Sequence, residues 1–200
     1  MSTLTPLSRR DVLKAGGALI VTFAFEGRLP CLAAAQGRGV VSDATKPLDP
    51  KLVDSFIAIH ADGTVIVYSG KVDIGTGMRI AVAQMAGEEL GIAPSRITVI
   101  DGDTGLCPDQ GGTGGSNGLT RGGMEIRRAA ATARQALLAR AAAQVGRPAG
   151  ELTIVDGQIR PIAGGTGVSI ASLVGDRQLS INVDEKAPLG EPARFAVIGK

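Results

Sequence analysis

Two glycine-rich turns are the parts of this sequence best suited to bind a ligand. The first, at residues 70–78, reads G-K-V-D-I-G-T-G-M, and the second, at 102–116, reads G-D-T-G-L-C-P-D-Q-G-G-T-G-G-S. Glycine lets a bulky anionic group approach the backbone, and amides at the start of a helix point outward as donors. Each turn leads toward a predicted helix. If the two turns face one cleft, they would hold something larger than a single phosphate.

The sequence alone leaves other interpretations of these turns open. The first turn lacks the third glycine of a dinucleotide-binding fingerprint, because residue 80 is Ile80, and no G-K-[ST] follows to make a P-loop. It could simply connect a strand to a helix, and the second turn could be a low-complexity linker. Four side chains in the second turn argue against the linker interpretation, because they are of types that fix turns or bind anions. These are Asp109, Gln110, Thr113 and Ser116.

The residue patterns of both turns resemble those of the molybdopterin-binding large subunits of the xanthine dehydrogenase and aldehyde oxidase family. The resemblance is strongest to the bacterial branch typified by isoquinoline 1-oxidoreductase. That branch has a G-K-V-E-I-G-Q-G-like turn, then a helix with A-Q-x-x-A-E-E-L, and then a G-D-T-x-x-x-P-D-Q-G-G-T-x-G-S loop. This chain carries A-Q-M-A-G-E-E-L at residues 83–90 and nearly the whole second loop. The likeness covers roughly residues 52–200 and marks the chain as an N-terminal segment of such a subunit.

The resemblance implies which residues contact the cofactor. We expect these to be Gly75, Thr76 and Gly77 in the first turn and Gln110, Gly111, Gly112, Thr113, Gly114, Gly115 and Ser116 in the second. Two positions depart from the family. Thr76 replaces a glutamine that helps to bind the pterin, and Asn117 stands where an arginine often follows the serine. No residue is expected to ligate a metal or to be catalytic, and Glu191 lies in a G-E-P triplet that only imitates the family's catalytic segment.

The resemblance also implies the chemistry of the intact protein. The cofactor would be molybdopterin, as its cytosine dinucleotide, carrying molybdenum, and the reaction would be hydroxylation of an aldehyde or an N-heterocycle. Electrons would leave through a separate [2Fe-2S] subunit and a cytochrome c subunit with haem c. The remaining domains of the large subunit would be further partners, and we expect the isolated chain to be inactive. The alternative from another class is a non-enzymatic exported α+β module that binds a protein or an anionic ligand.

Composition limits the other function classes. The chain has no Trp, one Tyr and four Phe, so it lacks the aromatic surfaces on which single-stranded nucleic acids stack. The formal net charge of +2 comes from the first 35 residues, and the remainder is close to neutral, which argues against DNA as a partner. The only two cysteines, Cys31 and Cys107, cannot ligate an iron–sulfur cluster, so such a centre would belong to another polypeptide.

The N-terminus has the features of an export signal. Arg9 and Arg10 precede an apolar stretch of about eleven residues, and an A-A-A sequence follows at 33–35. The apolar stretch is too short to span a bilayer, which needs roughly twenty residues. We therefore expect a twin-arginine signal at 1–35, a linker at 36–51, and a periplasmic location. An amphipathic or disordered N-terminus with an accidental arginine pair is the alternative.

Hydrophobic periodicity predicts an α+β fold for residues 52–185. Strands are expected at 56–60 and 64–68 around an Asp-Gly turn, at 96–100, and in a hairpin at 151–160 around a second Asp-Gly turn. Helices are expected at 78–90, at 124–145 and near 169–174, and an extended tail at 186–200 would lead to a next domain. The element order favours one mixed sheet with the two main helices packed on one side.

Five arginines make the second predicted helix and its approach basic. The usual explanation is a solvated face, and the alternative is that Arg121, near the helix start, meets a phosphate. These residues are Arg121, Arg127, Arg128, Arg134 and Arg140.

Overall fold

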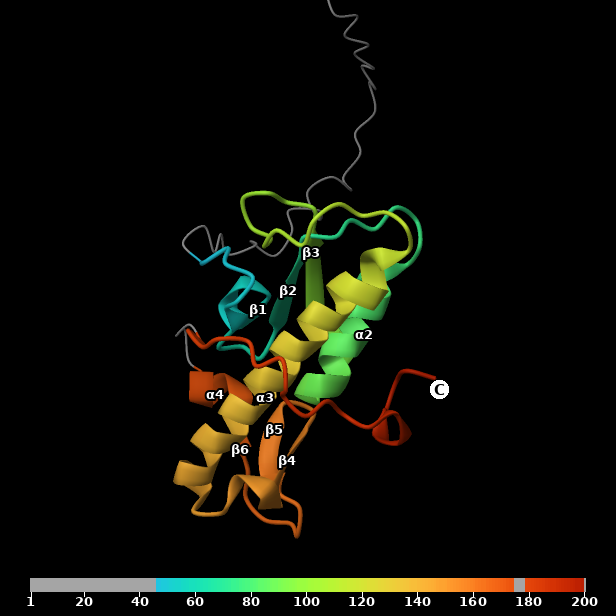
Figure 1. Ribbon diagram of the computed structural model, residues 1–200. Coiled ribbons are helices and arrows are strands. Elements are labelled where there is room, and N and C mark those ends of the chain that lie inside the picture. Colours follow the sequence, from blue (N-terminus) through green and yellow to red (C-terminus); the bar gives the residue numbers. More distant parts are fainter. Residues whose placement is uncertain (1–45, 175–178, 200) are drawn as a thin grey trace, which may run out of the picture. The chain divides into compact units, whose positions relative to one another are not determined.

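The computed structural model describes residues 46–174 and 179–199 (Figure 1). The predicted signal at 1–35 and most of the predicted linker lie outside these residues. The described part forms one compact unit of two small sheets and two long helices. The α+β class expected from the sequence is therefore confirmed. Among the described residues, no helix combines the length and apolar character that a membrane span requires.

The first sheet is mixed, and two of its three strands end at the glycine turns. Strand β1 (Ile57–Ile59) runs antiparallel to β2 (Val65–Ser69), and β2 runs parallel to β3 (Ile97–Asp101). Parallel neighbours need a crossover connection, and α2 (Met78–Leu90) supplies it. Because β2 and β3 are parallel, their carboxyl ends, Ser69 and Asp101, lie side by side. The two glycine turns follow directly from these paired ends.

The helices lie next to each other and cover the sheet. Helix α2 ends at Gly91, which adopts the left-handed conformation that favours glycine, and α3 (Met124–Val145) ends in the same way at Gly146. Figure 1 shows α2 and α3 side by side along the strands, and they contact each other extensively. Both observed helices match the ranges predicted from periodicity.

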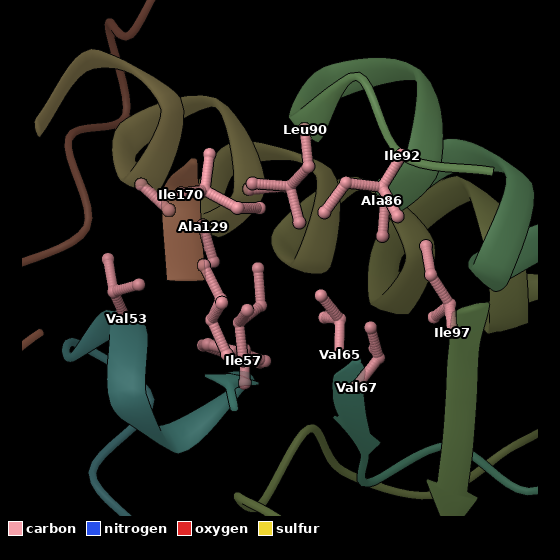
Figure 2. Close-up of a cluster of buried hydrophobic side chains, with 14 of the residues drawn as sticks. Val53, Ile57, Val65, Val67, Ala86, Leu90, Ile92, Ile97, Ala129 and Ile170 are labelled. Atoms are coloured by element: carbon pink, nitrogen blue, oxygen red, sulfur yellow. The ribbon is translucent and has the colours of Figure 1, made fainter. Parts of the chain in front are cut away.

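Apolar side chains from both layers meet in one core. Val65 and Val67 of β2 and Ile97 of β3 point toward Ala86 and Leu90 of α2 (Figure 2). The face of α3 that enters this core is built mostly of alanine. Small side chains let the two helices approach closely. A core packed in this way needs few large aromatic side chains, and the sequence contains few of them.

The later strands form a second sheet instead of extending the first. Strands β4 (Leu152–Val155), β5 (Gln158–Pro161) and β6 (Val168–Ser169) are antiparallel in that order, and α4 (Ile170–Val174) follows. The hairpin at 151–160 is confirmed, but the expectation of a single sheet is wrong. The alternation of each strand was readable in the sequence, whereas strand partners depend on contacts far apart along the chain.

A π-helix, Gly118–Gly123, continues directly into α3, so the helical stretch begins before residue 124, where the sequence predicted its start. Gly122 and Gly123 are buried here. A β-carbon on Gly122 would lie 2.4 Å from Cγ of Lys71, and one on Gly123 would lie 3.2 Å from Sδ of Met85. Glycine is therefore required for close packing, and this packing outweighs its low helix propensity.

Candidate cofactor-binding site

The first glycine turn is organised around the carboxylate of Asp73. Oδ1 of Asp73 accepts hydrogen bonds from the amides of Gly75 (3.0 Å) and Thr76 (2.9 Å), and Oδ2 accepts one from the amide of Arg79 (3.1 Å). The Arg79 amide, followed by those of Thr76, Gly75 and Gly77, lowers the pKa of Asp73 below its ordinary value. An internal anion thus already uses the amides that the sequence assigned to the cofactor.

Asp101 fixes this turn to the end of β3. Its Oδ2 accepts the amide of Asp73 at 2.8 Å, and its Oδ1 lies 2.8 Å from Nη2 of Arg79. The side chain of Asp101 is almost fully buried, whereas that of Arg79 is half exposed. The start of α2 is therefore tied to the neighbouring strand as well as to its own turn.

Gln110 joins both turns to the start of α3. Its Oε1 accepts the amide of Gly70 at 2.9 Å, and its Nε2 donates to the carbonyl of Gly122 at 3.0 Å and to Oε2 of Glu125 at 2.7 Å. The residue is only 2% exposed. With both ends of its amide engaged, Gln110 has a positioning role in this structure, and its contact with a cofactor stays a prediction.

Lys71 lies beneath the second turn and holds it from below. This lysine is 1% exposed, and its Nζ donates to the carbonyls of Gly111 (3.1 Å) and Gly112 (2.7 Å). The hydroxyl of Thr113 accepts the amide of Val72 at 2.9 Å. These contacts bring the two turns into one surface.

The outer side of the second turn is the part best suited to receive an anion. The amides of Gly112, Thr113, Gly115 and Ser116 bond no acceptor within the part of the chain that the structure describes. Gly111, Gly112, Gly114 and Gly115 are all exposed, and a β-carbon added to any of them would meet no protein atom within 4 Å. Open donors on an uncrowded backbone fit the phosphates and polar edge of a pterin cofactor.

The other polar residues of interest lie away from this surface or serve another contact. Arg121 is exposed and lies 3.4 Å from the Glu125 carboxylate. Glu191 forms an exposed pair with Arg194 at 3.3 Å, in the C-terminal segment. Cys107 is buried, and burial raises the pKa of its thiol. Over the described ranges, no three His, Cys, Asp or Glu side chains gather where they could hold a metal ion.

The residues whose side chains hold the two glycine turns in place by hydrogen bonds were not identified from the sequence. Asp73, Lys71 and Asp101 lie inside or next to the motifs, yet their roles depend on contacts between segments. The one available signal was charge, since Lys71 and Asp73 are the two charged residues in a turn that is otherwise uncharged.

The fold and the turns define an α+β domain that presents exposed loop amides at the carboxyl ends of two parallel strands. A sequence profile described as the molybdopterin cofactor-binding domain matches residues 35–195. The chain belongs to this family. The resemblance of the two glycine turns to molybdopterin-binding subunits is thereby confirmed.

Known proteins support the assignment. A nicotinate dehydrogenase subunit of Pseudomonas putida is 35% identical over 161 residues, which are 80% of this chain and 14% of the relative. The probable hypoxanthine oxidase XdhD of Escherichia coli K12 is 33% identical over 176 residues, covering 81% of this chain and 18% of the relative. This chain thus spans less than a fifth of the length of either relative.

Solved structures agree with the sequences. Reconstituted CO dehydrogenase from Oligotropha carboxidovorans matches 59% of this chain with a TM-score of 0.53 and 28% identity. Quinoline 2-oxidoreductase from Pseudomonas putida 86 matches 59% as well, with a TM-score of 0.53 and 27% identity. In each case the match covers 15% of the solved chain.

Proposed function

We propose that this chain supplies part of the molybdopterin cradle in the large subunit of a molybdenum hydroxylase that oxidises aldehydes or N-heterocycles. The observation that carries the proposal is the set of four open amides, those of Gly112, Thr113, Gly115 and Ser116, in a domain of the molybdopterin-binding family. The bound cofactor would supply the molybdenum and the redox chemistry. The chain's own residues would bind and orient it.

Each part of the surface has a distinct task in this proposal. The open amides of Gly112, Thr113, Gly115 and Ser116 would donate to the phosphates or the pterin edge. Lys71 and Gln110 keep those amides in place from behind, through the carbonyls of the second turn and the Gly70 amide. In the first turn, Thr76 is exposed next to Asp73 and would present its hydroxyl at the rim.

Substitution of Gly114 tests the proposal with little risk to the fold. Gly114 is exposed, has open space around its α-carbon, and does not adopt a left-handed φ. Gly114→Val should therefore fold normally but keep a flat ligand away from the backbone. We expect a loss of at least about tenfold in copurified molybdenum and pterin, equivalent to ~1.4 kcal/mol of binding free energy.

Gly150→Val is the matched control. Gly150 is also exposed, free of neighbours and outside the left-handed region, but it lies in the turn between α3 and β4. Cofactor content should equal the wild-type value in this variant. A Gly114→Val protein with wild-type cofactor content would show that the second turn is only a connection.

The form of the cofactor and the partners complete the proposal. We propose the cytosine dinucleotide form, a [2Fe-2S] subunit, and a cytochrome c with haem c as the electron acceptor. One relative is named as the gamma subunit of the 6-hydroxypseudooxynicotine dehydrogenase complex of Paenarthrobacter nicotinovorans, at 35% identity over 74 residues. Such a name supports a multi-subunit assembly. Copurification followed by nucleotide and iron analysis tests each partner and the cofactor form separately.

Export is a further part of the proposal. The support is the Arg9–Arg10 pair, the short apolar stretch and the small residues at 33–35. Replacing both arginines with lysine should retain the chain in the cytoplasm. Unchanged amounts in the periplasmic fraction would remove twin-arginine export from the proposal.

A further inference from the structure

The A-Q-M-A-G-E-E-L stretch of α2 contains two glutamates that the cofactor surface does not use. Both lie at the end of α2 away from the glycine turns. Glu89 is buried, with its side chain 0% exposed, and Glu88 lies at intermediate depth. A buried carboxylate is costly unless it is fully paired, so the contacts of Glu89 require an explanation.

Two arginines of α3 pair with Glu89. Nε of Arg127 lies 2.8 Å from Oε1 of Glu89, and Nη1 of Arg134 lies 2.7 Å from Oε2. The arginine side chains are only 16% and 18% exposed. The expectation of a solvated arginine face is therefore wrong for these two residues, because a buried acid on the neighbouring helix draws them inward.

The C-terminal segment completes this ion network. The amide of Gly190 donates to both carboxylate oxygens of Glu89, at 2.9 and 3.0 Å. The carbonyl of Gly190 accepts from Nη2 of Arg127 at 2.7 Å, and the carbonyl of Pro188 accepts from Nη2 of Arg134. Without the segment, partly buried charged groups would lose three hydrogen-bond partners, which is unfavourable in a low dielectric.

Glu88 holds the same segment further along. Its Oε2 accepts the amide of Ala196 at 2.9 Å, and its Oε1 accepts those of Val197 and Ile198 at 2.7 and 2.9 Å. Between these two contact points, the ring of Phe195 lies 5.3 Å from the guanidinium of Arg127. Figure 1 shows the red C-terminal segment running past the lower end of α2.

We propose that Glu88, Glu89, Arg127 and Arg134 form a docking site for the backbone of a C-terminal segment, and that its occupant is the chain's own segment 187–198, which includes a short 3-10 helix at Pro192–Arg194. We call these four residues the tail clamp. The contacts are almost all with backbone amides and carbonyls, so the site recognises the backbone of the segment rather than a particular set of side chains. The four charges sum to zero, and each pairs within the site or with the segment. This inference is independent of the proposed cofactor.

Hydrogen exchange on the full chain tests the tail clamp. Glu88→Gln keeps the shape of the side chain but removes the charge that holds three successive amides. We expect exchange at residues 195–198 to become at least about tenfold faster, which corresponds to ~1.4 kcal/mol of local opening. Exchange in α3 and the urea midpoint should stay at wild-type values.

Glu185→Gln is the matched control, because Glu185 is exposed and bonds no other residue in the described ranges. It makes the same change in net charge and should leave exchange in the segment unaltered. A second variant, Glu89→Gln, should speed exchange at Gly190 and also lower the urea midpoint, since it leaves two arginines without their carboxylate.

Three results would overturn the inference. The first is exchange at 195–198 that is as fast in the wild-type chain as in a free peptide. The second is a Glu88→Gln chain that exchanges at the wild-type rate. The third is a Glu88→Gln chain in which α3 and the segment lose protection equally, because the segment would then not be a separately docked unit.

Discussion

Replacing Gln110 with methionine should loosen both glycine turns at once. The amide group of Gln110 bonds the Gly70 amide, the Gly122 carbonyl and the Glu125 carboxylate, at 2.9, 3.0 and 2.7 Å. Methionine has a similar length but can make none of these bonds. The Glu125 side chain is 31% exposed and can turn to water, whereas the Gly122 carbonyl is buried and the Gly70 amide is partly buried.

The loss of folding stability follows from two groups that stay without a partner, the Gly70 amide and the Gly122 carbonyl. Each unsatisfied buried group costs about 1–3 kcal/mol, and the extra apolar surface of methionine returns roughly 1 kcal/mol. We expect a net loss of about 3 kcal/mol in the free energy of unfolding. For a chain of this size that corresponds to a fall of about 6–12 °C in the melting temperature.

Urea unfolding followed by circular dichroism measures this loss. Gln135→Met is the control, because Gln135 is exposed on α3, and its change should stay within about 0.5 kcal/mol. A Gln110→Met chain as stable as the control would refute the reasoning, since the amide would then contribute nothing to joining the turns.

Three further predictions concern packing, pH and activity. Gly122→Ala should lower the free energy of unfolding by about 1–2 kcal/mol in urea, because its β-carbon would lie 2.4 Å from Cγ of buried Lys71, and this overlap outweighs the gain in helix propensity. Burial raises the pKa of Asp54 above 3.8, so its contribution to stability is full below that pH and is lost as pH rises through the raised value. Asp54→Asn, which can still accept the Leu179 amide, should therefore gain stability relative to wild type as pH increases from 3 to 7, and a parallel pair of pH profiles would contradict this. The purified chain, supplied with cofactor and an artificial electron acceptor, should not oxidise aldehydes or N-heterocycles, and turnover that disappears in Glu191→Gln would overturn that expectation.

The local elements could be predicted from the sequence, and α2 shows why. Its apolar residues recur with helical spacing, Gly91 ends the helix in a left-handed conformation, and Pro94 prevents continuation. All of these signals lie within one stretch of chain. The two Asp-Gly turns were readable for the same reason.

Features that depend on distant contacts could not be predicted. Arg127 and Arg134 are drawn inward by Glu89, which lies 38 and 45 residues away along the chain. Residue 122 is a glycine inside a helix because the side chain of Lys71 occupies the space where a β-carbon would lie. The candidate site shows the same division. The sequence indicated two turns as candidates for the site, but the Asp73 carboxylate that already uses the first turn's amides became visible only in the folded chain.

Helix α2 connects two fixed points, and this limits how its length can vary. The Asp73-centred turn leads into its first residue, and the two glutamates of the tail clamp lie in its last turn. The stretch from Met78 to Glu88 sets a spacing of about 15 Å between them, and each added residue would turn one end by roughly 100° against the other. A single insertion inside α2 would thus aim Glu88 and Glu89 away from the arginines of α3 while leaving every side chain intact. We expect α2 to accept many substitutions but no insertion or deletion, a pattern that a scan of single-residue insertions would reveal as an abrupt gap between residues 78 and 90.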